Sequence, residues 1–136
     1  MSYGVSAALQ QAVYQQLSND ASITALVGSA VYDTIPSGTL PDTYVSLGPE
    51  VVRDRSDKTG SGANHIFEVS VVTTIAGFAT AKSVGAAISD ALHRADMALS
   101  RGTLVGLVFV RADAKRIGSG DTRRIDLKFR ARVDDS

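Results

Sequence analysis

The stretch KTGSG, from Lys58 to Gly62, contains the residue types of a phosphate-binding loop. Such a loop lies between a strand and a helix and has its lysine after the glycines, so that backbone amides and the helix start hold the phosphates. Here the lysine comes before the glycines, and a strand-like segment follows. The same residues match one box of the serine β-lactamases, but the chain lacks the accompanying Ser-x-x-Lys box. The residue order therefore argues against nucleotide binding and against acyl transfer.

Asp90, His93 and Asp96 follow one another at intervals of three residues in a segment with helical spacing, so their side chains could approach one cation. A metal site would need more ligands than this segment offers. The alternative is a solvated helix face on which Asp90 and Arg94 form an i,i+4 ion pair.

Nucleophilic catalysis also lacks its usual residues. The chain has no cysteine, and its other histidine, His65, has no local carboxylate except Glu68. None of the serines lies in a Gly-x-Ser-x-Gly elbow. The sequence therefore favours a protein that is not an enzyme and predicts neither a cofactor nor a metal.

A row of cations lies on one face of the last predicted strand and comprises Arg124, Lys128, Arg130 and Arg132, diluted by Asp126. Such a row can meet phosphates or an acidic partner, or it can be a charged face that discourages edge-to-edge pairing. No aromatic residue shares that face, which disfavours stacking on single-stranded nucleic acid. The 14 basic and 14 acidic residues of the chain cancel, so no overall field draws it to nucleic acid or to an anionic membrane. A subunit or other protein contact is the favoured interpretation, with a bland surface or a nucleic-acid backbone contact as alternatives.

Length and composition predict one domain over residues 1–136, since 44% of the residues are hydrophobic and the chain is long enough to bury a core. No apolar run approaches the ~20 residues that a membrane-spanning helix needs. The first residues lack the basic end and apolar block of a signal peptide. We therefore expect a protein made and used in a cytosol, without a membrane partner.

Apolar periodicity predicts the elements of the fold. Helices are expected at 2–18, 20–28 and 78–99, and strands at 30–35, 43–52, 65–75, 103–117 and 122–135. Pro49 indicates an edge or a bulge in the second of these strands. A polar stretch of thirteen residues, RDRSDKTGSGANH from Arg53 to His65, separates two strands and is expected to be a loop. The expected fold class is α+β, with an antiparallel or mixed sheet of about four main strands, two longer helices packed on one face, and a long β-hairpin loop.

Five segments together resemble a known family. They are VSAALQQAVYQQLSND, ALVGSAVYDTIP, LPDTYVSLGPE, HIFEVSVVTTIAGFATAKSVGAAISDAL and FVRADAKRIGSGDTRRIDLKFRARV. Their order and spacing resemble the small tail completion (tail terminator) proteins of long-tailed bacteriophages and phage-like gene transfer agents. The resemblance covers nearly the whole chain, although each motif alone is unspecific.

The resemblance implies a structural protein that closes into a hexameric ring at the head-proximal end of the tail tube. The ring would end tube polymerisation and join the tail to the filled head, while DNA passes through the lumen without being read. The implied partners are further copies of the chain, the tail tube protein and head–tail connector proteins. The implied location is the host bacterial cytoplasm during assembly, and then the tail or neck of the particle. Alternatives are another neck connector, such as a head-completion ring, and a non-specific DNA-backbone-binding module.

The resemblance also implies a role for the polar stretch, as a hairpin loop that packs on the tube subunit below. Its mixed charges would make the contact and its glycines would let it adapt, whereas a merely solvated loop is the alternative. The expected contact residues are Arg53, Asp54, Arg55, Asp57, Lys58, Thr59, Gly60, Ser61 and Gly62. Arg124, Lys128, Arg130 and Arg132 are expected at a subunit or head-side contact.

Overall fold

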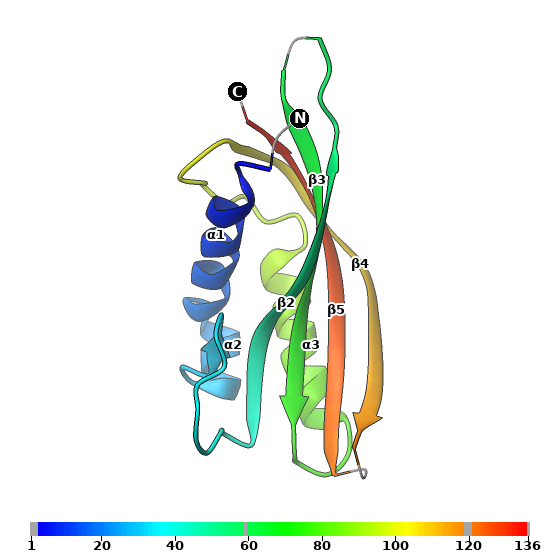
Figure 1. Ribbon diagram of the computed structural model, residues 1–136. Helices are drawn as coiled ribbons and strands as arrows, with labels where there is room; N and C mark the ends of the chain where they lie inside the picture. The colour runs from blue at the N-terminus through cyan, green and yellow to red at the C-terminus, as the bar shows by residue number, and fades with distance from the viewer. Residues whose placement is uncertain (1–2, 59, 119–120, 136) are drawn as a thin grey trace.

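A five-stranded sheet with helices on one face forms the body of the protein (Figure 1). The computed structural model describes residues 3–58, 60–118 and 121–135. The helices are α1 (Ser6–Ser18), α2 (Ala21–Val27) and α3 (Ala79–Leu92), and the strands are β1 (Val31–Tyr32), β2 (Thr43–Asp54), β3 (Gly62–Thr73), β4 (Thr103–Ile117) and β5 (Thr122–Asp134). The predicted α+β class and the long β-hairpin are confirmed.

The strand order β1-β2-β3-β5-β4 places β3 and β5 at the centre of the sheet. β1 is parallel to β2, with Val31 opposite Val45, and the other neighbouring pairs are antiparallel. The strand predicted at 30–35 is reduced to two residues. The chain leaves the sheet after Tyr32, and Pro36 lies in the exposed loop that follows.

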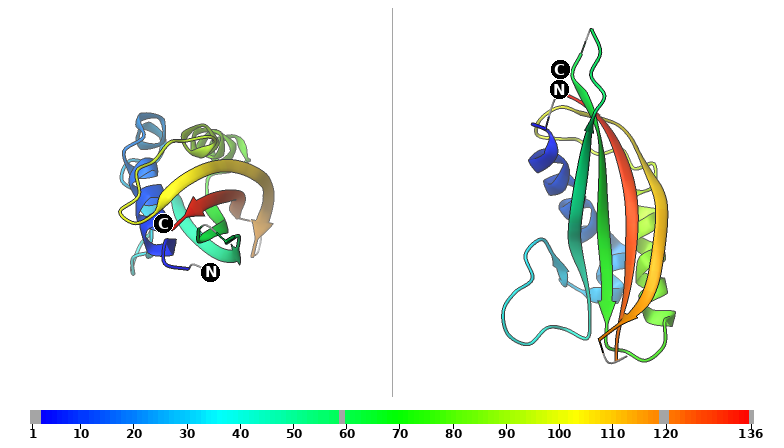
Figure 2. Two further views of the ribbon diagram at one scale, coloured as in Figure 1. Left: turned by 90° about the horizontal axis from the view of Figure 1, so that it is seen from above. Right: turned by 45° about the vertical axis from the view of Figure 1, so that its right-hand side comes forward.

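The core lies between the sheet and the helices α1 and α3, which pack on the same face (Figure 2). Helical spacing on α1 and α3 and strict alternation along β3 and β5 direct their apolar side chains to this layer. Its fully buried members include Leu9, Val13, Leu17, Val69, Val71, Val84, Ile88, Leu92, Phe129 and Val133. Among the described residues no helix covers the opposite face of the sheet.

A β-bulge at Gly48 and Pro49 interrupts β2, which confirms the prediction from the proline. Across the bulge β2 has one residue more than β3, and Glu50 lies opposite the buried Phe67. A Cβ atom at Gly48 would lie 3.1 Å from the Glu68 carbonyl oxygen, so glycine allows the close approach of the two strands. The bulge thereby turns the Glu50 side chain towards the helix-covered face.

The helix α3 ends at Leu92, so the prediction of a helix that continues to residue 99 is wrong. His93 is extended, and Arg94 has a positive φ of 60°. The Arg94 N–H donates a hydrogen bond of 2.7 Å to the Leu107 carbonyl of β4. The chain therefore leaves the helix to bind the edge of the sheet, which apolar periodicity alone does not indicate.

Candidate functional site: a hairpin and a charged sheet face

The β2–β3 hairpin extends beyond the helices at one end of the molecule (Figure 1). Both strands continue into the stretch from Arg53 to His65 that was expected to be a loop, with Asp54 opposite Ala63. β5 pairs with the same part of β3, and Ala63 and His65 are fully buried. Only residues 55–61 connect the two strands. The expected loop is therefore largely a ladder of three strands with a short polar tip.

Two carboxylates of the tip hold the turn itself. Asp54 Oδ1 accepts hydrogen bonds from the Ser56 hydroxyl (2.6 Å) and the Ser56 N–H (3.2 Å), and Asp57 Oδ1 accepts one from the Gly60 N–H (2.9 Å). The hydrogen bond from the Ser56 side chain lowers the pKa of Asp54. Asp54 and Asp57 thus bind within the turn, while the cations Arg53, Arg55 and Lys58 are exposed.

The glycines of the hairpin have different surroundings. Gly62 is buried at the start of β3, where a Cβ atom would lie 3.1 Å from the Val133 carbonyl oxygen and 3.2 Å from that of Arg55. Glycine therefore allows the close packing of the chain at this position. A Cβ atom at Gly60 would meet nothing within 4 Å. Thr59 lies outside the described residues.

The end of β5 anchors the base of the tip, which consists of its first and last residues, Arg55 and Ser61. The Asp135 N–H donates to the Ser61 carbonyl (2.7 Å), and Arg132 Nη2 donates to the Arg55 carbonyl (3.2 Å). Arg101 in turn makes two hydrogen bonds to the Asp135 carboxylate, at 3.0 and 2.8 Å. The base is therefore fixed to the sheet, and the tip projects from it.

A polar cluster lies between α1 and the hairpin. Ser6 Oγ donates to Glu50 Oε1 (2.6 Å), and His65 Nδ1 lies 3.1 Å from Glu50 Oε2. Burial raises the pKa of Glu50, but the hydrogen bonds from His65 and Ser6 outweigh it, and the pKa is lowered. The serine hydroxyl binds the carboxylate and not the imidazole, so the cluster does not activate a nucleophile. The carboxylate beside His65 is Glu50 and not Glu68, because the bulge in β2 sets its direction.

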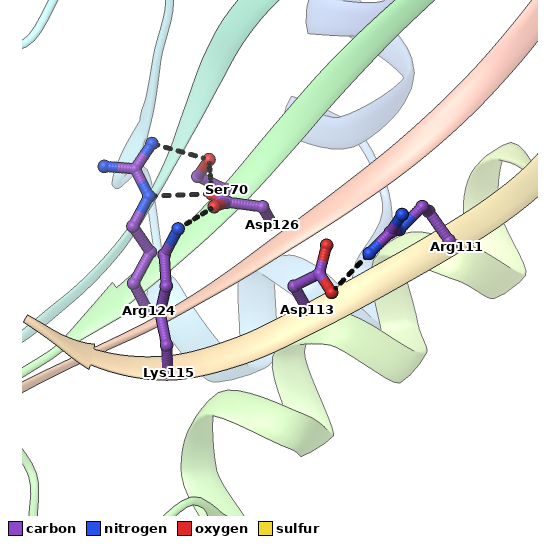
Figure 3. Close-up of polar contacts among 6 residues, drawn as sticks. All are labelled: Ser70, Arg111, Asp113, Lys115, Arg124 and Asp126. Atoms are coloured by element: carbon purple, nitrogen blue, oxygen red, sulfur yellow. Dashed lines mark hydrogen bonds and ion pairs between the residues drawn. The ribbon is translucent and has the colours of Figure 1, made fainter.

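Asp126 lies at the centre of a polar cluster on the helix-free face of the sheet (Figure 3). It accepts hydrogen bonds from Ser70 Oγ (2.6 Å) and Arg124 Nε (2.7 Å), and Lys115 Nζ lies 3.3 Å away. Burial raises the pKa of Asp126, but the hydrogen bonds from Ser70 and Arg124 and the nearby positive charge outweigh it, and the pKa is lowered. The charge of Arg124 is therefore balanced within the sheet.

The remaining three cations of the predicted row have different surroundings. Lys128 lies opposite Glu68 of β3. Arg130 is exposed and lies opposite Ile66, whereas Arg132 binds the base of the hairpin. The four cations of the row therefore have different neighbours and do not form a continuous basic strip.

Asp90, His93 and Asp96 do not share a helix face, because α3 ends before Asp96. His93 Nδ1 accepts a hydrogen bond of 3.0 Å from the Phe109 N–H of β4. Arg94 has left the helix, and no ion pair joins it to Asp90 in the described structure.

The described ranges contain no group of three or more acidic or histidine side chains that could hold a metal ion. In the same ranges, no helix has the length and apolar character needed to cross a membrane.

A family model described as tail completion protein gp17 matches residues 11–134 of the chain. The chain belongs to this tail completion family. A chain in a solved structure described as the virion of a native gene transfer agent particle is similar to this member of the family, with 65% sequence identity and a TM-score of 0.94. The similarity covers 98% of the present chain and 99% of that chain. No match was found among curated proteins.

The resemblance to tail completion proteins that the sequence segments indicated is thereby confirmed. Family membership gives the chain a structural role in tail assembly. In a tail completion protein the hairpin tip and the helix-free sheet face are candidate contact surfaces for other parts of a particle.

Proposed function

We propose that this tail completion protein forms a ring at the head-proximal end of the tail tube, where it ends tube polymerisation and joins the tail to the filled head. The observation that carries the proposal is the 65% identity, over nearly the full length of both chains, to a chain of a gene transfer agent virion. The ring contains six copies, and its partners are the tube protein and head–tail connector proteins. It assembles in the host bacterial cytoplasm and remains in the tail or neck of the particle.

The tip of the β2–β3 hairpin is the surface that we assign to the tail tube. It projects beyond the helices, and its base is fixed to β5 by hydrogen bonds to Arg55 and Ser61 (Figure 1). A rigid base with exposed cations suits a contact that must fix the orientation of a subunit on a preformed tube. The contact set includes both strand residues and tip residues: Arg53, Asp54, Arg55, Asp57, Lys58, Thr59, Gly60, Ser61 and Gly62.

DNA passes through the lumen of the proposed ring without being held. Each phosphate contact would add a salt-dependent attraction, and a sliding duplex tolerates few of them. Asp126 supports this assignment because it balances Arg124 and Lys115 on the helix-free face. We assign Arg124, Lys128, Arg130 and Arg132 to a subunit or head-side contact.

Electron microscopy of particles produced without this protein tests the proposal. We expect tails of uncontrolled length that are detached from filled heads. Tails of normal length that are merely unattached would instead place the protein on the head side of the neck, as another connector. Normal, attached tails would refute a role in tail completion altogether.

A further inference from the structure

The fold leaves two flanks open at opposite edges of the sheet, since β1 ends the strand order on one side and β4 on the other (Figures 1 and 2). The first, the β4 flank, consists of Lys82, Gly85, Phe109, Val110, Ala112 and Ala114. The second, the α1–β1 flank, consists of Tyr3, Ala7, Gln11, Tyr14, Tyr32 and Asp33. A contact between unlike flanks of two copies would repeat from one copy to the next.

The β4 flank is an open, apolar strand edge. A groove of about 340 Å³ between α3 and β4 has small residues such as Gly85 and Ala112 in its lining. Phe109 and Val110 are 37% and 45% exposed, and the Phe109 ring packs edge-on against Phe129 with centroids 5.8 Å apart. In the described structure, the two residues after α3 bind this edge at Leu107, through the Arg94 N–H, and at Phe109, whose N–H donates to the His93 imidazole. β4 is apolar up to Val110 and charged beyond it, and an open edge with exposed apolar side chains is a template for contact with another chain.

The α1–β1 flank has the composition of the centre of a protein interface. It borders a groove of about 740 Å³. Tyr3 and Tyr14 are 61% and 37% exposed, and the Tyr32 ring packs on Tyr44 with centroids 5.8 Å apart. Exposed tyrosines without lysine neighbours are typical of such centres.

The two flanks are complementary in charge. The first 52 residues, which include α1, β1 and most of β2, contain no lysine or arginine, and Asp33 and Asp42 are exposed there. Arg111 pairs with Asp113 and Lys115 with Asp126, but Lys82 on α3 and Arg116 on β4 join no ion pair in the described structure and make this side positive. A like-with-like contact between two β4 flanks would instead bring these cations together. The charges therefore favour a contact between unlike flanks.

We propose that the β4 flank of one copy packs on the α1–β1 flank of the next copy in a head-to-tail contact. The inference rests on the proposed ring and specifies which surfaces build it. Each copy uses opposite edges of its sheet for its two neighbours, so a series of such contacts ends only when the ring closes.

Cysteine cross-linking in assembled particles tests the contact, and the chain has no cysteine that would interfere. Particles are prepared with the double variant Tyr14→Cys/Val110→Cys and treated with a short bismaleimide. We expect a ladder of products at multiples of the chain mass, because every copy then links to both neighbours. The variants Tyr14→Cys and Val110→Cys alone should leave the chain unlinked. A second pair, Ala7→Cys/Ala112→Cys, keeps the test available if the first is not incorporated.

A matched control places the second cysteine on the helix-free face at a residue that we assign to no contact, in Tyr14→Cys/Val51→Cys, and should give no ladder. Dimers from Val110→Cys alone would overturn the proposal in favour of a two-fold β4 contact. Absence of a ladder from both double variants would also overturn it. Tail length, measured in variant particles that were not treated with the cross-linker, distinguishes a wrong choice of contact surfaces from a wrong proposed function. Regular tails without cross-links would refute only the choice of flanks, whereas regular tails in particles that lack the protein would refute the tail-terminating function.

Discussion

Glu50 is held by partners that lie far from it in the sequence, and replacing it by glutamine tests their effect on stability. The pKa of Glu50 is lowered in the folded protein, so folding favours its ionised form. This stabilisation is present above the unfolded pKa of about 4.3 and is lost as the pH falls through the lower folded value. We expect the free energy of unfolding of the wild type to decrease below about pH 4.5 more steeply than that of Glu50→Gln. Urea denaturation between acidic and neutral pH measures both curves.

Glu68→Gln provides the control, because Glu68 lies on the other face of the sheet and outside the cluster with Ser6 and His65. Its acid limb should follow the wild type. Identical pH dependence for Glu50→Gln and the wild type would show that the cluster does not contribute to acid sensitivity.

Asp126 balances two cations on the helix-free face, and Asp126→Asn tests whether this balance limits DNA binding. The change removes the negative charge beside Arg124 and Lys115 while it keeps the side-chain shape. We expect tighter binding to duplex DNA at low salt, with the slope of log affinity against log salt steeper by about 0.9 for each additional phosphate that the variant binds. Fluorescence anisotropy over a salt series measures this slope.

Asp121→Asn is the control: it makes the same charge change at an exposed turn and should have a smaller effect on DNA binding. Equal slopes for the two variants would argue against a shielding role of Asp126.

At the scale of elements, the hairpin depends on the close approach of Val133 of β5 and of Arg55, just after β2, to Gly62 of β3. A Cβ atom there would press on carbonyl oxygens 3.1 and 3.2 Å away. We therefore expect Gly62→Ala to lower the free energy of unfolding by about 1–3 kcal/mol, as overpacking does in a core. Gly60→Ala is the matched control, because nothing lies within 4 Å of its Cβ position. Thermal denaturation compares the two variants, and equal stability would show that the strands separate at no cost.

The charge of the hairpin tip should matter for the tube contact and not for the fold. Arg55 exposes its side chain at the tip, so Arg55→Glu should leave thermal stability unchanged. We expect its binding to isolated tail tubes to weaken roughly tenfold, about 1.4 kcal/mol, if the tip docks there. Co-sedimentation with tubes measures the binding. Arg94→Glu reverses an exposed charge away from the tip and should bind normally. Unaltered tube binding by Arg55→Glu would remove the tip from the contact.

The sequence predicts most elements correctly because their patterns are local. Alternation along 122–135 predicts β5, and Asp20 and Gly28 delimit α2 as expected. The wrong predictions concern the ends of helices and strands whose positions depend on contacts with residues far away in the sequence. α3 stops early because Arg94 binds β4, and the strands of the hairpin continue because β5 supports β3 beyond the apolar residues.

For the whole molecule, the fold class follows from the order of the elements, but the surfaces do not. The cations of β5 look alike in sequence, yet strand pairing brings Lys115 of β4 to the Asp126 that Arg124 already binds, and it gives Arg132 a bond to the hairpin. The carboxylate that meets His65 depends on a one-residue bulge in β2. The open β4 edge becomes visible only once the strand order is known. The partners of the charged side chains and the exposed edge of the sheet therefore depend on strand pairing, which local sequence patterns do not reveal.

The position of Asp135 beside the hairpin has a practical consequence for labelling. Its N–H binds the Ser61 carbonyl, so an affinity tag or fluorescent protein fused directly after Asp135 would start next to the tip. The exposed turn at residues 74–77, between β3 and α3, lies at the opposite end of the sheet (Figure 1). A short epitope inserted there would leave the tip accessible. In micrographs it would also show which way each subunit points along the tail axis.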